Sequence, residues 1–298
     1  MKFRSLLKQH RADLALVIGN GINRYPPAPC TNSWHDLLAT LGNRYLRTTG
    51  GKIPAGIALT EFYDLLELQP GPSASEKSLQ REFCNLMRGW VPYEHHKRIV
   101  SWARRSECPL LTTNFDKVLG EAYGCKLLHT RRDRFTDYYP WETYYGHEQL
   151  DDSCTGFGIW HINGMEYYSR SIRLGLSHYM GSVQRARHWI HRGNERRLFS
   201  GQNVRDWRGF GTWLHIVFNK PLLIFGLGLE ESEVFLRWLL IERARYFRKF
   251  PEKKKEAWYF HTNEKDGSGK LFFLAGVGVA PVRVESYDEL YGAETWAD

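Results

Sequence analysis

The sequence predicts an α/β fold in which a Rossmann-like parallel sheet carries helices on both faces. Three largely apolar runs, at residues 14–18, 108–112 and 221–225, are typical of strands that are buried on both faces, as in a parallel sheet. Each run ends in glycines or in short polar residues, and amphipathic segments separate the runs. Such alternation is typical of right-handed β-α-β connections.

The first half of the chain supplies two of these strands. An amphipathic segment at residues 3–11 predicts a short helix before the first strand, and Ser33 is a typical N-cap for a helix over 34–46. Residues 58–105 carry apolar positions at helical spacing without a strand pattern, so we expect a helical insertion there. The strand at 108–112 is followed by a short helix.

The second half alternates in the same way around the third strand. The expected elements are a loop over 130–155, a strand over 156–162, an Arg-rich helical insertion over 177–218, a helix over 232–247, a strand over 257–261, a helix over 270–275 and a last strand over 282–285. We expect the two insertions to form a smaller helical layer on a single domain that spans residues 1–298.

The composition excludes several classes of protein. A chain of 298 residues with 42% hydrophobic residues buries a sizeable core and is not intrinsically disordered. No apolar run approaches the ~20 residues that a membrane-spanning helix needs. Charged residues near the N-terminus break any signal-peptide core. We therefore expect a cytoplasmic protein with no membrane partner.

The cysteines argue against a zinc site and against a disulfide framework. There are five, an odd number, and no two form a Cys-x-x-Cys pair. We expect buried or idle thiols at Cys30, Cys84, Cys108, Cys125 and Cys154, and no metal.

The net charge of +8 permits an anionic partner without naming one. Seven arginines fall between residues 185 and 208, and three lysines form a run at 253–255. Charge runs of this kind serve a solvated surface, a subunit contact or nucleic-acid binding, and the sequence leaves these alternatives open.

A strand that runs into Gly-x-Gly occurs twice, at residues 19–21 and 226–228. Glycine allows backbone amides to approach a phosphate, and the following helix offers its positive N-terminus. Neither loop completes the Gly-x-Gly-x-x-Gly pattern, since Arg24 and residues 229–232 occupy the later positions. An ordinary Rossmann dehydrogenase is therefore disfavoured.

Two further polar segments follow strands. Residues 113–116 read Thr-Asn-Phe-Asp, and the ordinary role of Asn or Asp at such a place is to cap the next helix. Residues 160–164 read Trp-His-Ile-Asn-Gly, and in an extended segment His161 and Asn163 share a face. A single histidine at a strand end is more often structural than catalytic.

The order of these four segments resembles that of the sirtuin-like family, over residues 13–291. The matching segments are 19–23 with the family's Gly-Ala-Gly-x-Ser, 112–116 with Thr-x-Asn-Tyr/Phe-Asp, 160–164 with its His-Gly segment, 171–179 with the segment that follows in bacterial members, 226–240 with the late Gly-x-Gly loop and its helix, and 276–287 with the terminal strand before Ser-Tyr-Asp.

The chain departs from the family pattern at two places. The family histidine directly precedes glycine, but Asn163 holds that position here, so we assign the catalytic histidine to His161. Asn20 and Asn23 replace small residues of the first loop.

The missing zinc ribbon separates branches of the family. Protein-deacylating sirtuins carry four zinc-binding cysteines, which this chain lacks, and it has helical insertions instead. In this it resembles the bacterial sirtuin-like NAD⁺ hydrolases of anti-phage defence, which cleave NAD⁺ to nicotinamide and ADP-ribose.

The resemblance implies roles for particular residues. Asn114 would orient the ribose and the attacking water, Asp116 would contact the nicotinamide or support its loop, and His161 would bind the ribose hydroxyls and act as base. Nicotinamide leaves as a neutral pyridine, so no acid/base carboxylate pair is required. The implied cofactor-binding residues are Gly19, Asn20, Gly21, Asn23, Thr113, Asn163, Gly226, Gly228 and Glu230, with no metal.

The resemblance also implies partners. Constitutive NAD⁺ cleavage would be toxic, so we expect a separate regulator, and stand-alone members of this kind resemble the homo-oligomeric subunit paired with a HerA-type hexameric ATPase. The alternatives are a non-catalytic module that binds NAD⁺ or ADP-ribose, a protein deacylase and a nucleic-acid-binding protein.

Overall fold

Eight strands of the computed structural model form one sheet in the order β3-β4-β5-β2-β1-β6-β7-β8. The structure describes residues 2–46, 52–69, 78–130, 139–202, 205, 207–262 and 267–297. The strands within these residues are β1 (Ala15–Ile18), β2 (Leu110–Thr112), β3 (Lys126–His129), β4 (Thr143–Gly146), β5 (Ile159–His161), β6 (Leu222–Phe225), β7 (Ala257–His261) and β8 (Ala280–Arg283).

The predicted parallel α/β architecture is confirmed. Strands β5, β2, β1, β6, β7 and β8 pair in parallel, in that order. The register places Ile18 beside both Thr112 and Phe225, so the carboxyl ends of β1, β2 and β6 are level. Every residue of these three central strands is buried, which explains their apolar sequences.

One edge of the sheet differs from the expectation of a loop over 130–155. Strand β4 lies in that stretch and pairs antiparallel with both β3 and β5, while residues 131–138 lie outside the described part. Tyr144 stacks on Trp160, and Tyr145 packs edge-on against His161. The prediction was wrong here because these long-range contacts, and not local composition, stabilise a strand of four residues.

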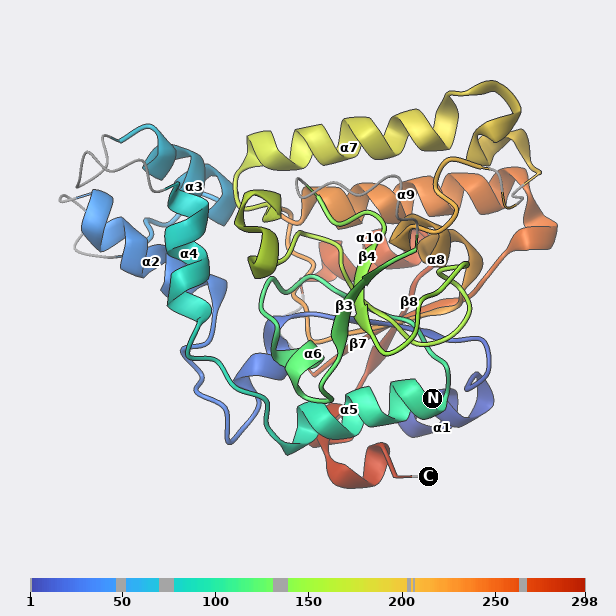
Figure 1. Cartoon of the computed structure of the whole chain (residues 1–298), viewed down its shortest axis with the longest axis horizontal. Helices are drawn as coiled ribbons and strands as arrows, with labels where there is room; N and C mark the ends of the chain where they lie inside the picture. The colour runs from blue at the N-terminus through green and yellow to red at the C-terminus, as the bar shows by residue number, and fades with distance from the viewer. Residues whose placement is uncertain are drawn as a thin grey trace.

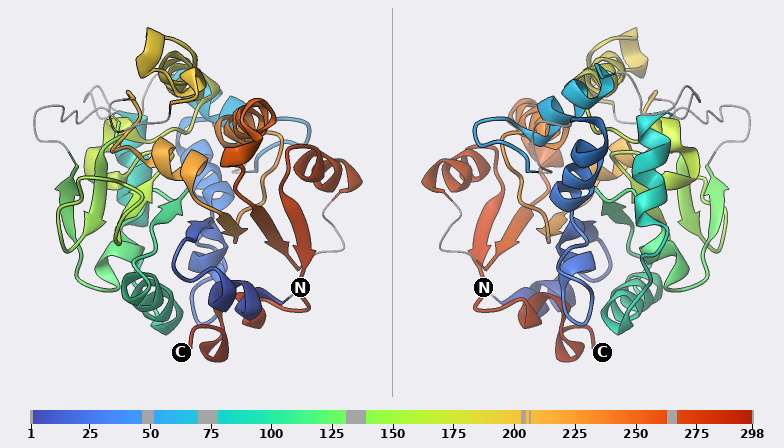
Figure 2. Two further views of the ribbon diagram at one scale, coloured as in Figure 1. Left: turned by 90° about the vertical axis from the view of Figure 1, so that its right-hand side faces the viewer. Right: turned by 90° about the vertical axis from the view of Figure 1, so that its left-hand side faces the viewer.

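Helices cover both faces of the sheet (Figures 1 and 2). They are α1 (Phe3–Gln9), α2 (Trp34–Tyr45), α3 (Leu59–Glu67), α4 (Leu79–Met87), α5 (Glu94–Arg105), α6 (Val118–Glu121), α7 (Leu176–His191), α8 (Trp213–Asn219), α9 (Val234–Lys249), α10 (Ser268–Gly276) and α11 (Asp288–Tyr291). None of these helices is long and apolar enough to cross a bilayer.

Alternate residues of the central strands belong to two different cores. Ala15 and Val17 of β1 pack with α7, α8, α9 and α10 on one face. Leu16 and Ile18 pack with α1, α5 and α11 on the other, where both chain termini lie (Figures 1 and 2). This period of two is the ordinary geometry of a strand between two helical layers.

The helices expected within 58–105 and 177–218 lie in three places. Helices α3 and α4 join α2 in a third apolar core at one side of the sheet, seen at the left of Figure 1. Helix α5 instead packs beneath the sheet. Helix α7 runs along α9, and α8 is buried between helices and sheet.

Candidate functional site

A cavity of about 540 Å³ opens at the carboxyl ends of the central strands. Ligands of open α/β sheets bind at this edge, because loops from several strands converge there. Six residues predicted to bind the dinucleotide line the cavity: Asn20, Gly21, Thr113, Gly226, Gly228 and Glu230.

Backbone hydrogen bonds join the two Gly-x-Gly loops of this cavity. The Gly19 amide donates to the Phe225 carbonyl at 3.0 Å, and the Gly21 amide donates to the Gly226 carbonyl at 2.7 Å. A Cβ atom at Gly19 would collide with Leu227 and lie 2.5 Å from the Gly226 oxygen. Gly226 itself has a positive φ of 72°. These glycines therefore permit the loops to pack closely, and Gly19 lies outside the cavity wall.

Side chains from β7 and α10 hold the second loop in place. The Tyr259 hydroxyl donates to the Leu227 carbonyl at 2.8 Å. Lys270 donates to the Gly228 carbonyl at 2.6 Å and pairs with Glu230 at 3.0 Å. Glu230 is thus held by a mostly buried cation at the cavity edge.

A buried polar cluster lies next to the cavity and connects the first loop to the segment after β2. Asn23 donates from Nδ2 to Asn20 at 2.9 Å and to Asp116 Oδ2 at 2.8 Å. The other oxygen of Asp116 accepts from the Val118 amide at 3.0 Å, at the start of α6. Burial raises the pKa of Asp116 to about 6, against the lowering effect of the hydrogen bonds from Val118 and Asn23.

His96 of α5 belongs to the same cluster, and the sequence analysis missed it. The Tyr93 amide donates to His96 Nδ1 at 3.0 Å, so the ring proton is assigned to Nε2, which lies 3.1 Å from Asn23 Oδ1. This bond orients the Asn23 amide so that its NH₂ group faces Asp116. Burial lowers the pKa of His96 to about 3 and keeps it neutral. The feature of the sequence that could have pointed to His96 is the pair His95-His96 at the start of a helix.

His161 is completely buried at the end of β5, directly beside Thr112 of β2. Its Nε2 lies 3.2 Å from the Asp116 backbone oxygen, which only accepts, so Nε2 carries the proton. Nδ1 is therefore a lone-pair acceptor, and it has no hydrogen-bond partner in the part of the chain that the structure describes. Burial lowers the pKa of His161 to about 3, so the ring is neutral.

Asn114 and Asn163 are also buried, and the side-chain amide of Asn114 makes no hydrogen bond within the described residues. Burial raises the pKa of Glu233, which lies in the cavity wall, to about 7, and a hydrogen bond from the Asn163 side chain acts to lower it. Buried polar atoms are nearly always hydrogen-bonded. Together with His161 Nδ1, the two polar side-chain atoms of Asn114 are three exceptions at one edge of the sheet.

The predicted site residues therefore fall into two adjoining sets. The cavity wall contains those named above, whereas the described wall does not include Gly19, Asn23, Asn114, Asp116, His161 or Asn163. Asn23 reaches the wall through its bond to Asn20, and Asn114 directly follows Thr113. The arrangement offers a cavity of small-molecule size, with neutral donors and acceptors beside it.

Tyr291 is a second residue that the sequence analysis missed. Its hydroxyl would lie too close to a Cβ atom at either Gly21 or Gly226, so it packs against both loops. That oxygen is buried and makes no hydrogen bond within the described residues.

One cluster elsewhere has the composition of a metal site. Asp152, Cys154 and His215 bring one ligand atom each within 4.8 Å of one another. Trp207 donates to His215 Nδ1 at 2.9 Å, so Nε2 carries the ring proton and presents no lone pair to a metal. Burial also raises the pKa of the Cys154 thiol, which favours its protonated form. The cluster does not fit a metal ion.

No protein-family model matches the chain, and no curated protein matches it.

Proposed function

We propose that this chain is an NAD⁺ hydrolase that releases nicotinamide and ADP-ribose. The observation that supports it best is a set of three polar atoms, on Asn114 and His161, that have no hydrogen-bond partner among the described residues and lie beside a cavity built from two Gly-x-Gly loops. A dinucleotide would supply hydrogen-bond partners for such atoms and lie along the loops.

Cleavage of NAD⁺ requires groups that position the ribose and the water more than it requires a proton donor. Nicotinamide leaves NAD⁺ as a neutral molecule, so the site has to hold the ribose, stabilise an oxocarbenium-like centre and orient water. The neutral His161 ring offers Nδ1 as an acceptor for a ribose hydroxyl or a water. Asn114 offers one donor and one acceptor for the same purpose. Asp116 fixes the segment that carries Asn114.

The test is nicotinamide release by the purified chain and its variants. Asn114→Ala and His161→Ala should each slow the reaction by about 100-fold or more, as expected when a group that positions the substrate or the water is lost. Asn219→Ala, outside the site, should retain the wild-type rate and controls for loss of an asparagine hydrogen bond. Thermal unfolding of each variant checks the fold. Wild-type turnover by His161→Ala would disprove its role.

A binding module without turnover is the second candidate. The complete burial of His161 favours it, as does Asn163 at the position of the family histidine. Calorimetric binding of ADP-ribose and NAD⁺ without nicotinamide release would establish this function in place of the first.

The wider setting belongs to the same proposal. We place the chain in the cytoplasm of a bacterium, as the homo-oligomeric effector of an anti-phage system regulated by a HerA-type ATPase. Co-purification with the ATPase encoded beside it, and a mass measurement of the complex, test the assembly. Separate elution of the two proteins would contradict it.

A further inference from the structure

A second cavity, of about 630 Å³, lies beneath α7 and beside β4. It shares no described lining residue with the cavity of the candidate site. Its wall combines four arginines, Arg173, Arg185, Arg196 and Arg208, with the aromatic side chains of Tyr139, Trp141 and Trp189. We call it the arginine cavity.

The arginine cavity carries a strong positive charge. Against four guanidinium groups and two histidines, the described wall contains a single carboxylate, Glu142. Guanidinium groups remain charged in proteins and bind phosphate or carboxylate oxygens in a bidentate geometry. Three of the four arginines come from the basic stretch at 185–208, whose purpose the sequence left open.

Arg173 is buried and held by its neighbours, which distinguishes this wall from an open basic surface. Its side chain is only 7% exposed, although burying a guanidinium is costly. Its Nε donates to the Ser182 hydroxyl at 3.0 Å, and its guanidinium lies 4.6 Å from the centre of the Tyr139 ring. These contacts hold a cation in a fixed position at the cavity wall before any ligand arrives.

The aromatic part of the wall is equally well supported. Trp141 is stacked on Trp213, with ring centres 5.2 Å apart, and packs edge-on against Trp189 at 4.8 Å. Fixed indole rings of this kind offer apolar surface to a planar group.

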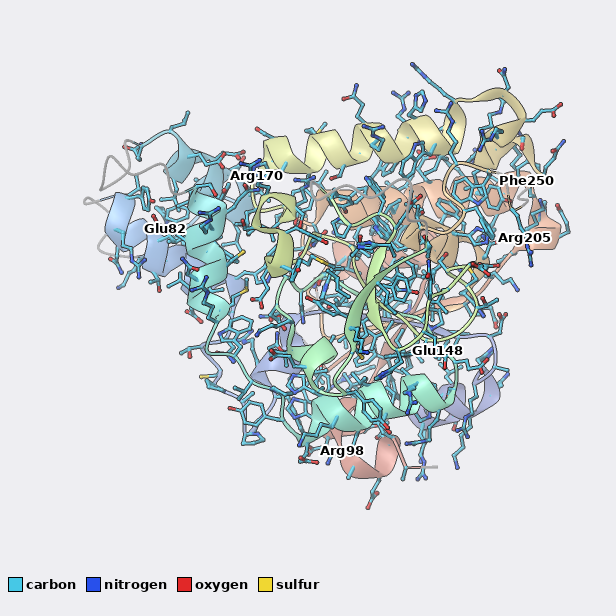
Figure 3. All side chains as sticks on the ribbon, in the orientation of Figure 1. Glu82, Arg98, Glu148, Arg170, Arg205 and Phe250 are labelled. Atoms are coloured by element: carbon cyan, nitrogen blue, oxygen red, sulfur yellow. The ribbon has the colours of Figure 1, made fainter. Side chains whose placement is uncertain are left out.

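We propose that the arginine cavity binds a nucleoside phosphate, with the phosphates on the arginines and the base against the tryptophans. Its volume is that of a small-molecule pocket, whereas duplex nucleic acid requires a broad contact surface. Arg170 and Arg205, which do not belong to the described wall, lie toward opposite sides of the molecule in Figure 3. The proposal does not depend on NAD⁺ cleavage at the candidate site.

The cavity and the candidate site nevertheless hold one backbone segment in common. The Arg173 amide donates to the Asn163 carbonyl at 2.8 Å, and the Tyr139 hydroxyl donates to the Ile162 carbonyl. These carbonyls belong to the two residues that follow His161 in the chain. An experiment must therefore distinguish the two cavities.

The experiment measures calorimetric binding of ATP, ADP, adenosine and inorganic pyrophosphate to the purified chain at fixed salt. We expect ATP and ADP to bind more tightly than adenosine. Arg185→Ala and Arg208→Ala should each weaken ATP binding by about tenfold, the usual effect of losing one charge-assisted contact. Arg187→Ala, an exposed arginine of α7 outside the wall, should leave it unchanged.

Other results would overturn the proposal. These are absence of ATP binding at millimolar concentration, equal weakening by Arg187→Ala, and binding of a duplex oligonucleotide where the mononucleotides fail. Asn114→Ala should leave ATP affinity intact even if it abolishes NAD⁺ cleavage. Loss of ATP binding in that variant would instead place the nucleotide in the candidate site.

Discussion

At the scale of single residues, the candidate site depends on a chain of hydrogen bonds that fixes orientation. The Tyr93 amide sets the tautomer of His96, His96 sets the rotamer of Asn23, and Asn23 donates to Asp116. Each member has a defined donor or acceptor role, so loss of one member disturbs the next. His96 thereby acts as a positioning residue and lies behind the cavity wall.

Replacement of His96 tests this chain. His96→Phe removes the donor to Asn23 and should lower kcat for NAD⁺ cleavage about tenfold, as expected for one buried hydrogen bond. His96→Gln keeps an amide donor and should recover part of the rate. Steady-state kinetics on both variants, with thermal unfolding as a control, give the comparison. Equal rates for the two variants would mean that the bond to Asn23 has no positioning role.

Asp116 predicts a pH dependence. Burial raises its pKa to about 6, so the folded chain holds this proton more tightly than the unfolded chain does. The stability that this bound proton contributes is fully present below about pH 4, the pKa of an aspartate in the unfolded chain. It is lost as the pH rises through about 6, the pKa in the folded chain. Asp116→Asn cannot titrate. Relative to wild type, its melting temperature should therefore rise between pH 4 and 7, and a constant difference would contradict the shifted pKa.

The sequence identified some of these residues and missed others for a clear reason. Asn114 and Asp116 directly follow a strand, so local pattern places them at the carboxyl edge of the sheet. His96 lies 73 residues from Asn23 in the chain, and no local pattern reports that contact. The burial of His161 likewise depends on Tyr145, whose strand was not foreseen.

At the scale of elements, the two Gly-x-Gly loops constrain each other by close contact. The sequence predicts both strands, β1 and β6, because strands that are buried on both faces consist of continuous apolar residues. That these strands are neighbours was not visible, since pairing depends on the whole sheet. The adjacency explains the glycines by loop packing as well as by any approach of phosphate.

Gly19→Ala tests the loop contact. The added methyl group meets Leu227 and the Gly226 carbonyl, so we expect a loss of about 1–3 kcal/mol of unfolding free energy, as for overpacking. Gly276→Ala, at the end of α10, meets no atom within 4 Å and is the matched control. Urea unfolding measures both. A Gly19→Ala variant as stable as the control would show that the loops separate easily.

At the scale of the whole molecule, one buried cation joins segments that are remote in the sequence. Arg243 of α9 donates to the carbonyls of Val217, Lys220, Lys255 and Glu256. These carbonyls end α8 and precede β6 and β7. Burial lowers the pKa of Arg243 to about 9. The Arg243 side chain thus links α8 and α9 to the segments that lead into β6 and β7.

Arg243→Ala should destabilise the chain more than any surface arginine does. Four carbonyls lose a partner at once, and we expect a loss of about 3–5 kcal/mol. Arg248→Ala, exposed on the same helix, should change stability by less than about 0.5 kcal/mol. Denaturant midpoints of the two variants decide the matter, and a small effect of Arg243→Ala would show that water replaces the guanidinium.

The sequence by itself determined the class of fold and the edge of the sheet where polar residues gather. Both follow from short-range patterns: apolar runs make buried strands, and the residues after a parallel strand lie at its carboxyl end. Only the tertiary structure decided the strand order, the place of His96 beside Asn23, and the convergence of Arg173 with Arg185, Arg196 and Arg208 on one cavity. Those outcomes depend on contacts between distant segments, which burial of the whole core selects and no local spacing encodes.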